Sequence, residues 1–345
     1  MVGMTNIYYL KYVRNTRLGL QKTWSGGLSV KAVITGATGF IGAALCEEML
    51  CNGHEVAAII RPGSRKRDRL DFPELLLDDR LQVIENTLED LHGLPSLVGG
   101  ADVFYHLAWN GSAGAEREDF DIQHSNIAYT AEAIRAAVEC GCKKFVGAGS
   151  QAEYGVVRGM AKEDGTVPHP FMMYGAAKLA AYQMGQVLAK QLGIKLVWPR
   201  IYSVYGVGEN PGTLVDYVIK TLWEDRVPEL SPCENLWNFM YITDCARALR
   251  ILGENEETEG IYHVASEDTR MLKEFVEEIR DIIAPGNELR FGAKSSNPER
   301  TFWLEPDVDR LKGLGFESHI TWKAGIERTA RQEIQVLVYK GETRS

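Results

Sequence analysis

The sequence VKAVITGATGFIG, which runs from Val30 to Gly42, decides how this chain folds. Its first six residues are mostly apolar or β-branched and predict a buried strand, and the residues after Gly42 have the composition of a helix. Glycines at positions 36, 39 and 42 lie between the two. Such a turn lets the backbone approach a pyrophosphate closely, and the helix N-terminus supplies free N–H groups and a positive dipole. The segment therefore predicts a dinucleotide-binding turn, and the alternative is a tight turn without a ligand.

Strand and helix patterns continue to alternate after this turn. Repeated strand–helix units predict a parallel sheet with helices on both faces, so the expected fold class is α/β, Rossmann-like and doubly wound. Beyond about residue 204 the alternation breaks, which indicates a small, mixed α/β C-terminal substrate lobe. We expect a dinucleotide-binding domain at 30–205 and a discontinuous lobe at 206–345, some segments of which return to the first domain. The expected strands are 55–60, 81–84, 103–107, 144–148, 195–199 and 261–265, and the expected helices are 43–50, 122–138, 174–192, 214–223, 243–252, 271–283 and 322–339.

Composition and charge exclude several classes of protein. The 345 residues include 38 Lys and Arg against 47 Asp and Glu, so the formal charge is −9 and a nucleic acid is not the expected partner. No uninterrupted run of about 20 apolar residues is present, so we expect no membrane-spanning helix. The six cysteines form neither a disulfide scaffold nor paired CxxC motifs. We expect reduced thiols, a cytoplasmic location and no metal site, with Cys140-Gly141-Cys142 as a weak exception.

Residues 1–29 form a predicted N-terminal arm with poor order. No Asp or Glu occurs before Glu47, whereas Lys and Arg do occur there. An acid-free leader of this kind is similar to an organelle transit peptide. It is short of Ser and has no clear cleavage signal, so we favour a loose arm or the product of an upstream start codon.

Tyr174 and Lys178 begin the predicted helix 174–192 at a spacing of four residues. This spacing places both side chains on one face of the helix, one turn apart. A free phenol has a pKa of about 10 and is a poor base at neutral pH, but a neighbouring ammonium favours its phenolate form. Ser150 ends the preceding apolar strand, at the edge where ligands collect in open parallel sheets. We expect Tyr174 to act as general acid/base, Lys178 to lower its pKa, and Ser150 to orient a substrate oxygen.

These motifs together resemble the extended short-chain dehydrogenase/reductase family, which includes the NAD(P)-dependent nucleotide-sugar epimerases and dehydratases. The likeness spans roughly residues 30 to 335, and its further motifs are SQAEYG from Ser150, the strand end at His106 to Ala108, and RIYSVYG from Arg200. It implies an enzyme with a nucleotide-sugar substrate and a homodimer formed through helices 122–138 and 174–192. The cofactor-binding residues expected are Gly36, Thr38, Gly39, Phe40, Ile41, Gly42, Arg61, Leu88, Leu107, Ala108, Lys178 and Ile201, and the substrate-binding residues expected are Trp109, Ser150, Gln151, Ser203 and Arg300.

The residue that follows the second strand bears on the choice of cofactor. An acid at this place binds the ribose hydroxyls of NAD, but this chain has Arg61, with further basic residues up to Arg69. The planar guanidinium suits a 2′-phosphate, so we expect NADP(H) to be favoured over NAD(H). The alternative is a solvated basic loop. Asn86-Thr87-Leu88 replaces the Gly-Asp-Leu that is common in the family, so the adenine contact is not carried over.

Other departures from the family pattern narrow the expected reaction. Dehydratases carry acids directly after the Ser or Thr, where this chain has Gln151 and Ala152, and the double epimerases carry Cys in place of Ala152. Glu153 lies one position further on and is expected to point elsewhere. What remains is redox at one carbinol of the sugar, either 4-ketoreduction or 4-epimerisation. A ketoreductase exchanges its cofactor with a pool, commonly NADPH, so Arg61 favours the ketoreductase; a non-catalytic NADP-binding sensor is the remote alternative.

The substrate side of the predicted site is less regular. Trp109 either lines the sugar pocket or covers the sheet edge, and Arg117 is a candidate for the substrate diphosphate. Ser203 stands where the family usually has an Asn that helps to hold the diphosphate. Arg300 lies in the segment where relatives place a diphosphate-binding Arg. His106 is expected to be structural rather than catalytic.

Overall fold

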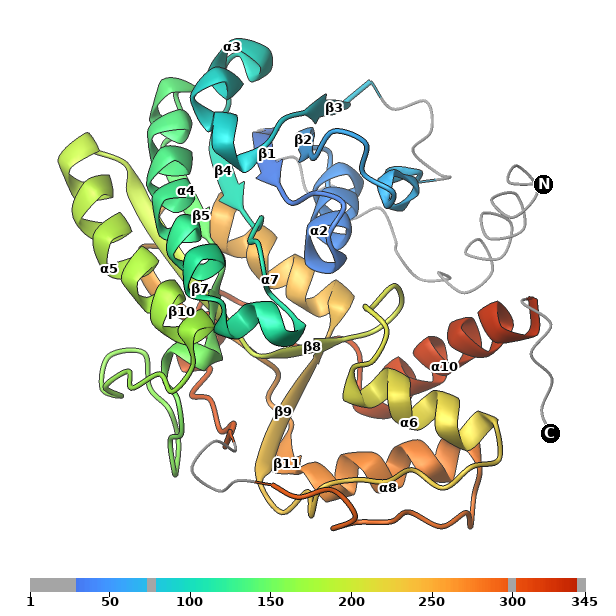
Figure 1. Cartoon of the computed structure of the whole chain (residues 1–345). Helices are drawn as coiled ribbons and strands as arrows, with labels where there is room; N and C mark the ends of the chain where they lie inside the picture. Colours follow the sequence, from blue (N-terminus) through green and yellow to red (C-terminus); the bar gives the residue numbers. More distant parts are fainter. Residues whose placement is uncertain (1–28, 73–78, 297–301, 340–345) are drawn as a thin grey trace.

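The computed structural model describes residues 29–72, 79–296 and 302–339. A parallel sheet of eight strands forms its centre (Figure 1), in the order β10-β7-β5-β4-β1-β2-β3, with β6 paired to β7 beside β5. The strands are β1 (Lys31–Thr35), β2 (Glu55–Ile60), β3 (Leu81–Glu85), β4 (Val103–His106), β5 (Lys144–Gly147), β6 (Gly149–Ser150), β7 (Lys195–Ile201) and β10 (Gly260–Val264). The strand order reverses between β1 and β4, and in such sheets ligands bind at the carboxyl edge beside that point.

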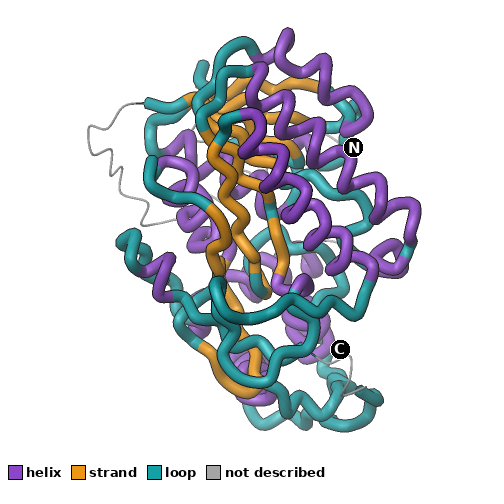
Figure 2. The backbone as a smooth tube through the Cα atoms, turned by 90° about the vertical axis from the view of Figure 1, so that its left-hand side faces the viewer, coloured by secondary structure: helices purple, strands orange, loops and turns teal. Residues whose placement is uncertain are grey.

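Both faces of this sheet are covered by helices (Figures 1 and 2). β1 shows why its sequence is an unbroken apolar run: Ala32 and Ile34 point into one buried cluster and Val33 into the other. The first cluster includes α2 and α7, which pack against each other, and the second includes α4 and α5. These helices are α2 (Phe40–Cys51), α7 (Ile242–Glu254), α3 (Leu94–Val98), α4 (Phe120–Glu139) and α5 (Met173–Leu192), and short 3₁₀ helices follow the strands at η1 (Arg67–Leu70), η2 (Leu88–Gly93), η3 (Gly114–Glu118) and η4 (Gln151–Glu153).

A smaller lobe lies beyond the carboxyl edge of the sheet, at the lower right of Figure 1. Its three-stranded sheet has the order β11-β9-β8, with β8 and β9 parallel and β11 antiparallel to β9. Aromatic rings fill its core: the ring of Trp322 lies 4.8 Å from those of Phe239 and Phe275 and 4.6 Å from that of Tyr205, measured between centroids. The elements of this lobe are β8 (Ser203–Tyr205), β9 (Leu236–Tyr241), β11 (Thr269–Met271), α6 (Leu214–Trp223), α8 (Leu272–Ile283) and α10 (Trp322–Tyr339), and α9 (Asp309–Lys312) lies against β10.

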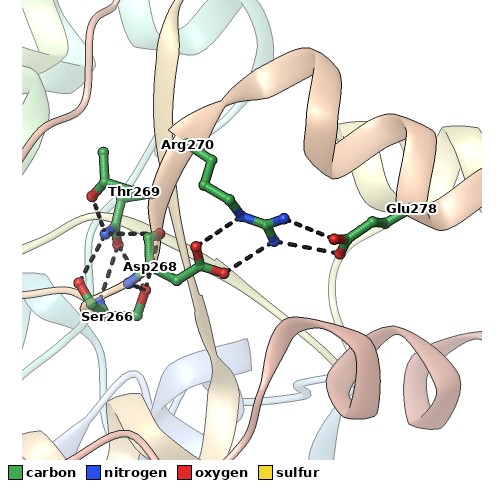
Figure 3. A network of polar contacts seen from close by, with 6 residues as sticks. Ser266, Asp268, Thr269, Arg270 and Glu278 are labelled. Carbon is green, nitrogen blue, oxygen red and sulfur yellow. Dashed lines mark hydrogen bonds and ion pairs between the residues drawn. The ribbon is translucent and has the colours of Figure 1, made fainter.

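Polar contacts fix the turn that leads into β11 (Figure 3). Arg270 bridges two carboxylates, with 2.8 Å from Nε to Asp268 and 2.8 Å from Nη1 to Glu278 on α8. Asn238 on β9 is fully buried, and its amide donates to the carbonyl oxygen of Ser266 at 2.8 Å. The small sheet is therefore tied to α8 by side chains as well as by strand pairing.

The glycine turn joins β1 to α2 with almost no space between them. Gly36 has a φ of +70°, and its carbonyl oxygen accepts a hydrogen bond of 2.8 Å from the Gly39 N–H. A Cβ on Gly36 would lie 2.8 Å from the Ala108 nitrogen, and one on Gly42 would lie 2.2 Å from the Gly36 oxygen. The helix N-terminus has no side-chain cap, so its first N–H groups are open to an anion.

The structure confirms the predicted α/β, doubly wound fold and its small mixed lobe. It differs from the sequence analysis in detail, because β8, β9 and β11 were not predicted. The lobe was predicted to be discontinuous, and α7 and β10, which follow residue 205 in sequence, lie with the large sheet, β10 as one of its strands and α7 in the core cluster on one face. The bounds of the two domains stay a prediction. The predicted N-terminal arm lies almost wholly outside the described residues.

Gly42→Ala tests the close packing of the glycine turn. The added methyl group meets a backbone oxygen that cannot move independently, so we expect a loss of about 1–3 kcal/mol in the free energy of unfolding and a much weaker cofactor complex. Gly100→Ala is the control, since a Cβ there meets nothing within 4 Å. Denaturant unfolding and cofactor titration measure the two effects; equal behaviour of the two variants would contradict the account.

Candidate active site

Tyr174 and Lys178 lie in the first turns of α5, with Lys178 almost completely buried. The Lys178 Nζ donates a 2.6 Å hydrogen bond to the Ala148 carbonyl, which follows β5, and lies 3.5 Å from the centroid of the Trp109 ring. Burial lowers the pKa of Lys178 to about 7, although the Glu153 carboxylate opposes this change. The ammonium is thus held at the carboxyl edge of the sheet by the backbone and by an indole face.

Ser150 ends β6 and caps the short helix η4. Its N–H donates to Glu153 Oε1 at 2.8 Å, and its Oγ accepts from the Ala152 N–H at 3.2 Å. A hydrogen bond from the Ser150 side chain to Tyr174 lowers the pKa of that phenol. The capping box therefore fixes the Ser150 hydroxyl beside the phenol and leaves it little rotational freedom.

Several opposing effects act on Tyr174. Burial raises its pKa, whereas the hydrogen bond from Ser150 and the Arg117 guanidinium lower it, and the Glu153 carboxylate raises it. The Arg117 guanidinium carbon lies 4.4 Å from the centroid of the Tyr174 ring. Trp109 meets the same ring edge-on, with 6.1 Å between centroids. The three predicted catalytic residues thus lie together, and Arg117, which the sequence suggested for a diphosphate, contacts the phenol ring.

A buried ion pair between Glu153 and Arg200 contacts the backbone of Ser150. Glu153 and Arg200 are 0% and 1% exposed, and Arg200 Nε lies 2.7 Å from Glu153 Oε2. The other carboxylate oxygen accepts from Trp198 Nε1 at 2.9 Å as well as from Ser150. Glu153 is thus engaged by Arg200, Trp198 and the Ser150 N–H, and this anchoring role was not predicted. A sequence signal for this ion pair was available: an acid, Glu153, stands within the SQAEYG motif, and an arginine, Arg200, lies near the end of the strand β7.

Apart from Lys178 on α5, the predicted cofactor residues lie at or after the carboxyl ends of strands of the large sheet. Gly36, Gly39 and Gly42 form the turn, and Phe40 and Ile41 begin α2. Thr38 Oγ1 lies 3.2 Å from Ser64 Oγ, in the basic segment after β2. The remaining predicted residues are Leu107 and Ala108 after β4, Leu88 at the start of η2, and Ile201, whose strand position pairs with Ser150.

The basic segment after β2 contacts both the glycine turn and the loop after β8. Arg61 is exposed directly after β2. Lys66 Nζ donates to Asn210 Oδ1 at 2.9 Å, and Arg69 Nη2 donates to the Gly208 carbonyl at 2.8 Å. Arg67 pairs with Glu85 at 3.2 Å on the surface. Lys66, Arg67 and Arg69 therefore have protein partners, whereas the exposed Arg61 directly follows β2.

The residues present fit a nicotinamide dinucleotide. The close approach of Gly36 to Ala108 leaves backbone, rather than side chains, facing the α2 N-terminus. Asn86, after β3, is 8% exposed, and its buried Oδ1 has no hydrogen-bond partner among the described residues. A ligand N–H would satisfy this acceptor.

The predicted substrate residues are only partly brought together. Trp109 lies against Lys178 and Tyr174, so it lines the catalytic group. Gln151 follows Ser150 directly, and its buried Oε1 has no partner among the described residues. Ser203 is half-buried at the start of β8, and Arg300 lies outside the described residues. His106 is buried beside Thr35, with 3.0 Å from Nδ1 to Oγ1, and burial lowers its pKa to about 3, consistent with a structural role.

Among the described residues, no helix combines the length and apolar character needed to cross a membrane. No group of three or more His, Cys, Asp or Glu side chains in that part of the chain has the arrangement of a metal site.

Comparison with known proteins supports the family assigned from the motifs. Residues 32–265 match the model of the NAD dependent epimerase/dehydratase family. The chain is 27% identical to an uncharacterised UDP-glucose epimerase of Bacillus subtilis, over 91% of this chain and 100% of that protein. It is 28% identical to the dTDP-6-deoxy-L-talose 4-dehydrogenase (NAD⁺) of Aggregatibacter actinomycetemcomitans, over 71% of this chain and 88% of that protein.

Solved structures show the same architecture. The UDP-glucuronic acid 4-epimerase of Bacillus cereus, in complex with NAD, superposes with a TM-score of 0.76 and 25% identity, over 90% of this chain and 98% of that one. The chain is therefore an enzyme that belongs to the NAD dependent epimerase/dehydratase family.

Proposed function

We propose that this enzyme carries out reversible redox at C4 of a nucleotide-linked sugar, with Tyr174 as general acid/base. The observation that carries the proposal is the grouping of Ser150, Tyr174 and Lys178 at the carboxyl edge of the sheet, beside the glycine turn. The 4-epimerase and 4-dehydrogenase among its similar proteins act on sugars of this class, as their names state.

The residues divide the chemistry among themselves. A bound nicotinamide supplies or accepts the hydride. Tyr174 takes the proton from the sugar hydroxyl on oxidation and returns it on reduction, while Ser150 holds the same oxygen by a hydrogen bond. The Lys178 ammonium would stabilise the phenolate, and its remaining N–H groups would donate hydrogen bonds to a ribose hydroxyl of the bound cofactor. Gln151 offers its unpaired Oε1 to a sugar hydroxyl.

Tyr174→Phe tests this assignment. The variant keeps the aromatic ring but lacks the hydroxyl that would transfer the proton. We therefore expect cofactor binding to persist and turnover to fall by about 10²–10⁴-fold. The assay is a screen of nucleoside diphosphate sugars and their 4-keto forms. Tyr182→Phe is the matched control on the same helix, because its hydroxyl contacts Gln186 rather than the catalytic group. Turnover at the wild-type rate in Tyr174→Phe would refute the role.

Two reactions fit this site. The 4-epimerase is supported by the B. cereus neighbour, and it would keep one bound cofactor through a catalytic cycle without net consumption. The 4-ketoreductase is supported by Arg61, because a reductase draws NADPH from a pool. Consumption of reduced cofactor in proportion to sugar identifies the ketoreductase, and sugar interconversion without consumption identifies the epimerase. Turnover of no nucleotide sugar, together with cofactor-dependent binding of a partner protein, would instead indicate a sensor.

The cofactor preference is a separate proposal. We infer that NADP(H) binds more tightly than NAD(H), because an exposed Arg61 replaces the usual acid after β2. Arg61→Ser should weaken NADPH binding by about 10–100-fold and leave NADH binding nearly unchanged. Arg67→Ser is the control, since that side chain pairs with Glu85 on the surface. Calorimetric dissociation constants decide the matter, and tighter NADH binding by the wild type would overturn the inference.

We infer that the partner in solution is a second copy, docked through α4 and α5. These helices pack side by side, and α5 presents an apolar depression lined by Gln183, Met184, Val187, Leu188 and Gln191. Met184 and Val187 are 62% and 58% exposed, which is unusual for large apolar side chains on one helix face. On α4, Phe120 is also exposed.

Val187→Glu should convert the dimer to a monomer, because a charge would be buried against the second copy. Val167→Glu is the control, since Val167 is 81% exposed and lies in a loop outside both helices. Sedimentation velocity measures the outcome. A wild-type monomer, or a Val187→Glu dimer, would contradict this interface.

A cytoplasmic location is also proposed. It rests on the six cysteines, all of which are free and five of which are buried. Burial raises the pKa of Cys46, Cys142 and Cys245, so these thiols stay protonated and unreactive, as suits a reducing compartment.

A further inference from the structure

Arg117 occupies an unusual place beside the catalytic group. It lies in η3, the short helix before α4, and its guanidinium covers the Tyr174 ring at 4.4 Å. Among the described residues, its polar contact is from Nη2 to the sulfur of Met172 at 3.3 Å, and its buried Nε has no hydrogen-bond partner. A guanidinium that contacts a thioether and an aromatic face has no anionic partner to balance its charge. The neighbouring Tyr174 side chain is the group that acquires a negative charge when it becomes a phenolate in the proposed reaction.

The charges around Tyr174 explain why a second cation matters. Lys178 Nζ lies 5.8 Å from the centroid of the Tyr174 ring, further away than the Arg117 guanidinium. Lys178 also donates a hydrogen bond to the Ala148 carbonyl and lies over the Trp109 ring. Its pKa is lowered to about 7 by burial, so part of its charge is lost near neutral pH, whereas an arginine stays charged.

The other charged groups near Tyr174 do not replace Arg117. On η4, Glu153 opposes the phenolate, and its charge is paired with Arg200 of β7. Glu118, the last residue of η3, accepts a hydrogen bond through Oε2 from the N–H of Met173 at the start of α5. Ser150 contributes a neutral hydrogen bond. Among the residues that the structure describes, Arg117 is therefore the permanent cation in direct contact with the ring.

We propose that Arg117 is a positioning residue that stabilises the phenolate form of Tyr174 by stacking its guanidinium on the ring. The attraction of a cation to an aromatic face grows when the ring becomes anionic, since the quadrupole is then joined by a full negative charge. The proposal rests on the proposed acid/base role of Tyr174. In the oxidation direction, the proton leaves the sugar hydroxyl for the phenolate oxygen, and Arg117 keeps its own protons throughout.

The test is a titration of Tyr174 itself, without substrate. The ultraviolet absorbance of phenolate is recorded against pH for the enzyme and for Tyr174→Phe. The chain has 14 tyrosines, and the difference between the two curves gives the titration of Tyr174 alone. The same pair is measured in Arg117→Met and Arg117→Lys backgrounds. We expect Arg117→Met to raise the pKa of Tyr174 by about one unit, which is a tenfold loss of phenolate below that pKa, and Arg117→Lys to restore part of it.

Kinetics provide the second readout. The acidic limb of kcat/KM for oxidation should move to higher pH in Arg117→Met by the same amount as the titration. Arg158→Met is the control, because Arg158 covers the Trp303 ring at 5.9 Å. Unchanged Tyr174 titration in a folded Arg117→Met overturns the proposal, and so does a rise in KM alone, which would make Arg117 a contact for a substrate anion. Because the titration needs no substrate, it stands even if the sugar assigned to the enzyme is wrong.

Discussion

The contact between the Gly36 carbonyl and the first turn of α2 is the constraint on which the rest of the structure depends. That oxygen lies so close to Gly42 that a Cβ would be 2.2 Å away, and Gly36 itself meets the backbone after β4. Three backbone segments therefore converge without side chains between them. This convergence places the uncapped α2 N-terminus at the carboxyl end of β1, next to the point where the strand order of the sheet reverses.

A second constraint holds the catalytic side of the sheet edge. The Glu153 carboxylate accepts from the Ser150 N–H, from Trp198 and from Arg200, so all its partners lie on β6 or β7. Removing one partner of such a buried pair commonly costs about 3–5 kcal/mol, because the other charge is left without compensation. The same pair carries an electrostatic effect: its negative end opposes the loss of charge from Lys178. One buried carboxylate thus connects the position of the serine to the charge of the lysine.

The sequence was informative where structure is local and less so where it depends on distant partners. Helix 214–223 and helix 322–339 have the predicted bounds, because each follows from its own apolar periodicity. β9, by contrast, is the aromatic run LWNFMY, and its identity as a strand depends on pairing with β8 and β11 on either side. The Tyr174/Lys178 pair could be predicted from a four-residue spacing. The Glu153–Arg200 pair, 47 residues apart in sequence, could not be predicted without the register of β6 and β7.

The basic segment after β2 has a further consequence for how the two lobes are joined. Lys66 and Arg69 donate to Asn210 and Gly208, in the loop that leads from β8 into α6, while Arg69 also reaches the Thr38 carbonyl of the glycine turn at 3.5 Å. Burial lowers the pKa of Lys66, and the neighbouring charges of Arg69 and Arg61 lower it further. The segment predicted to recognise a cofactor phosphate therefore also connects the glycine turn to the small lobe.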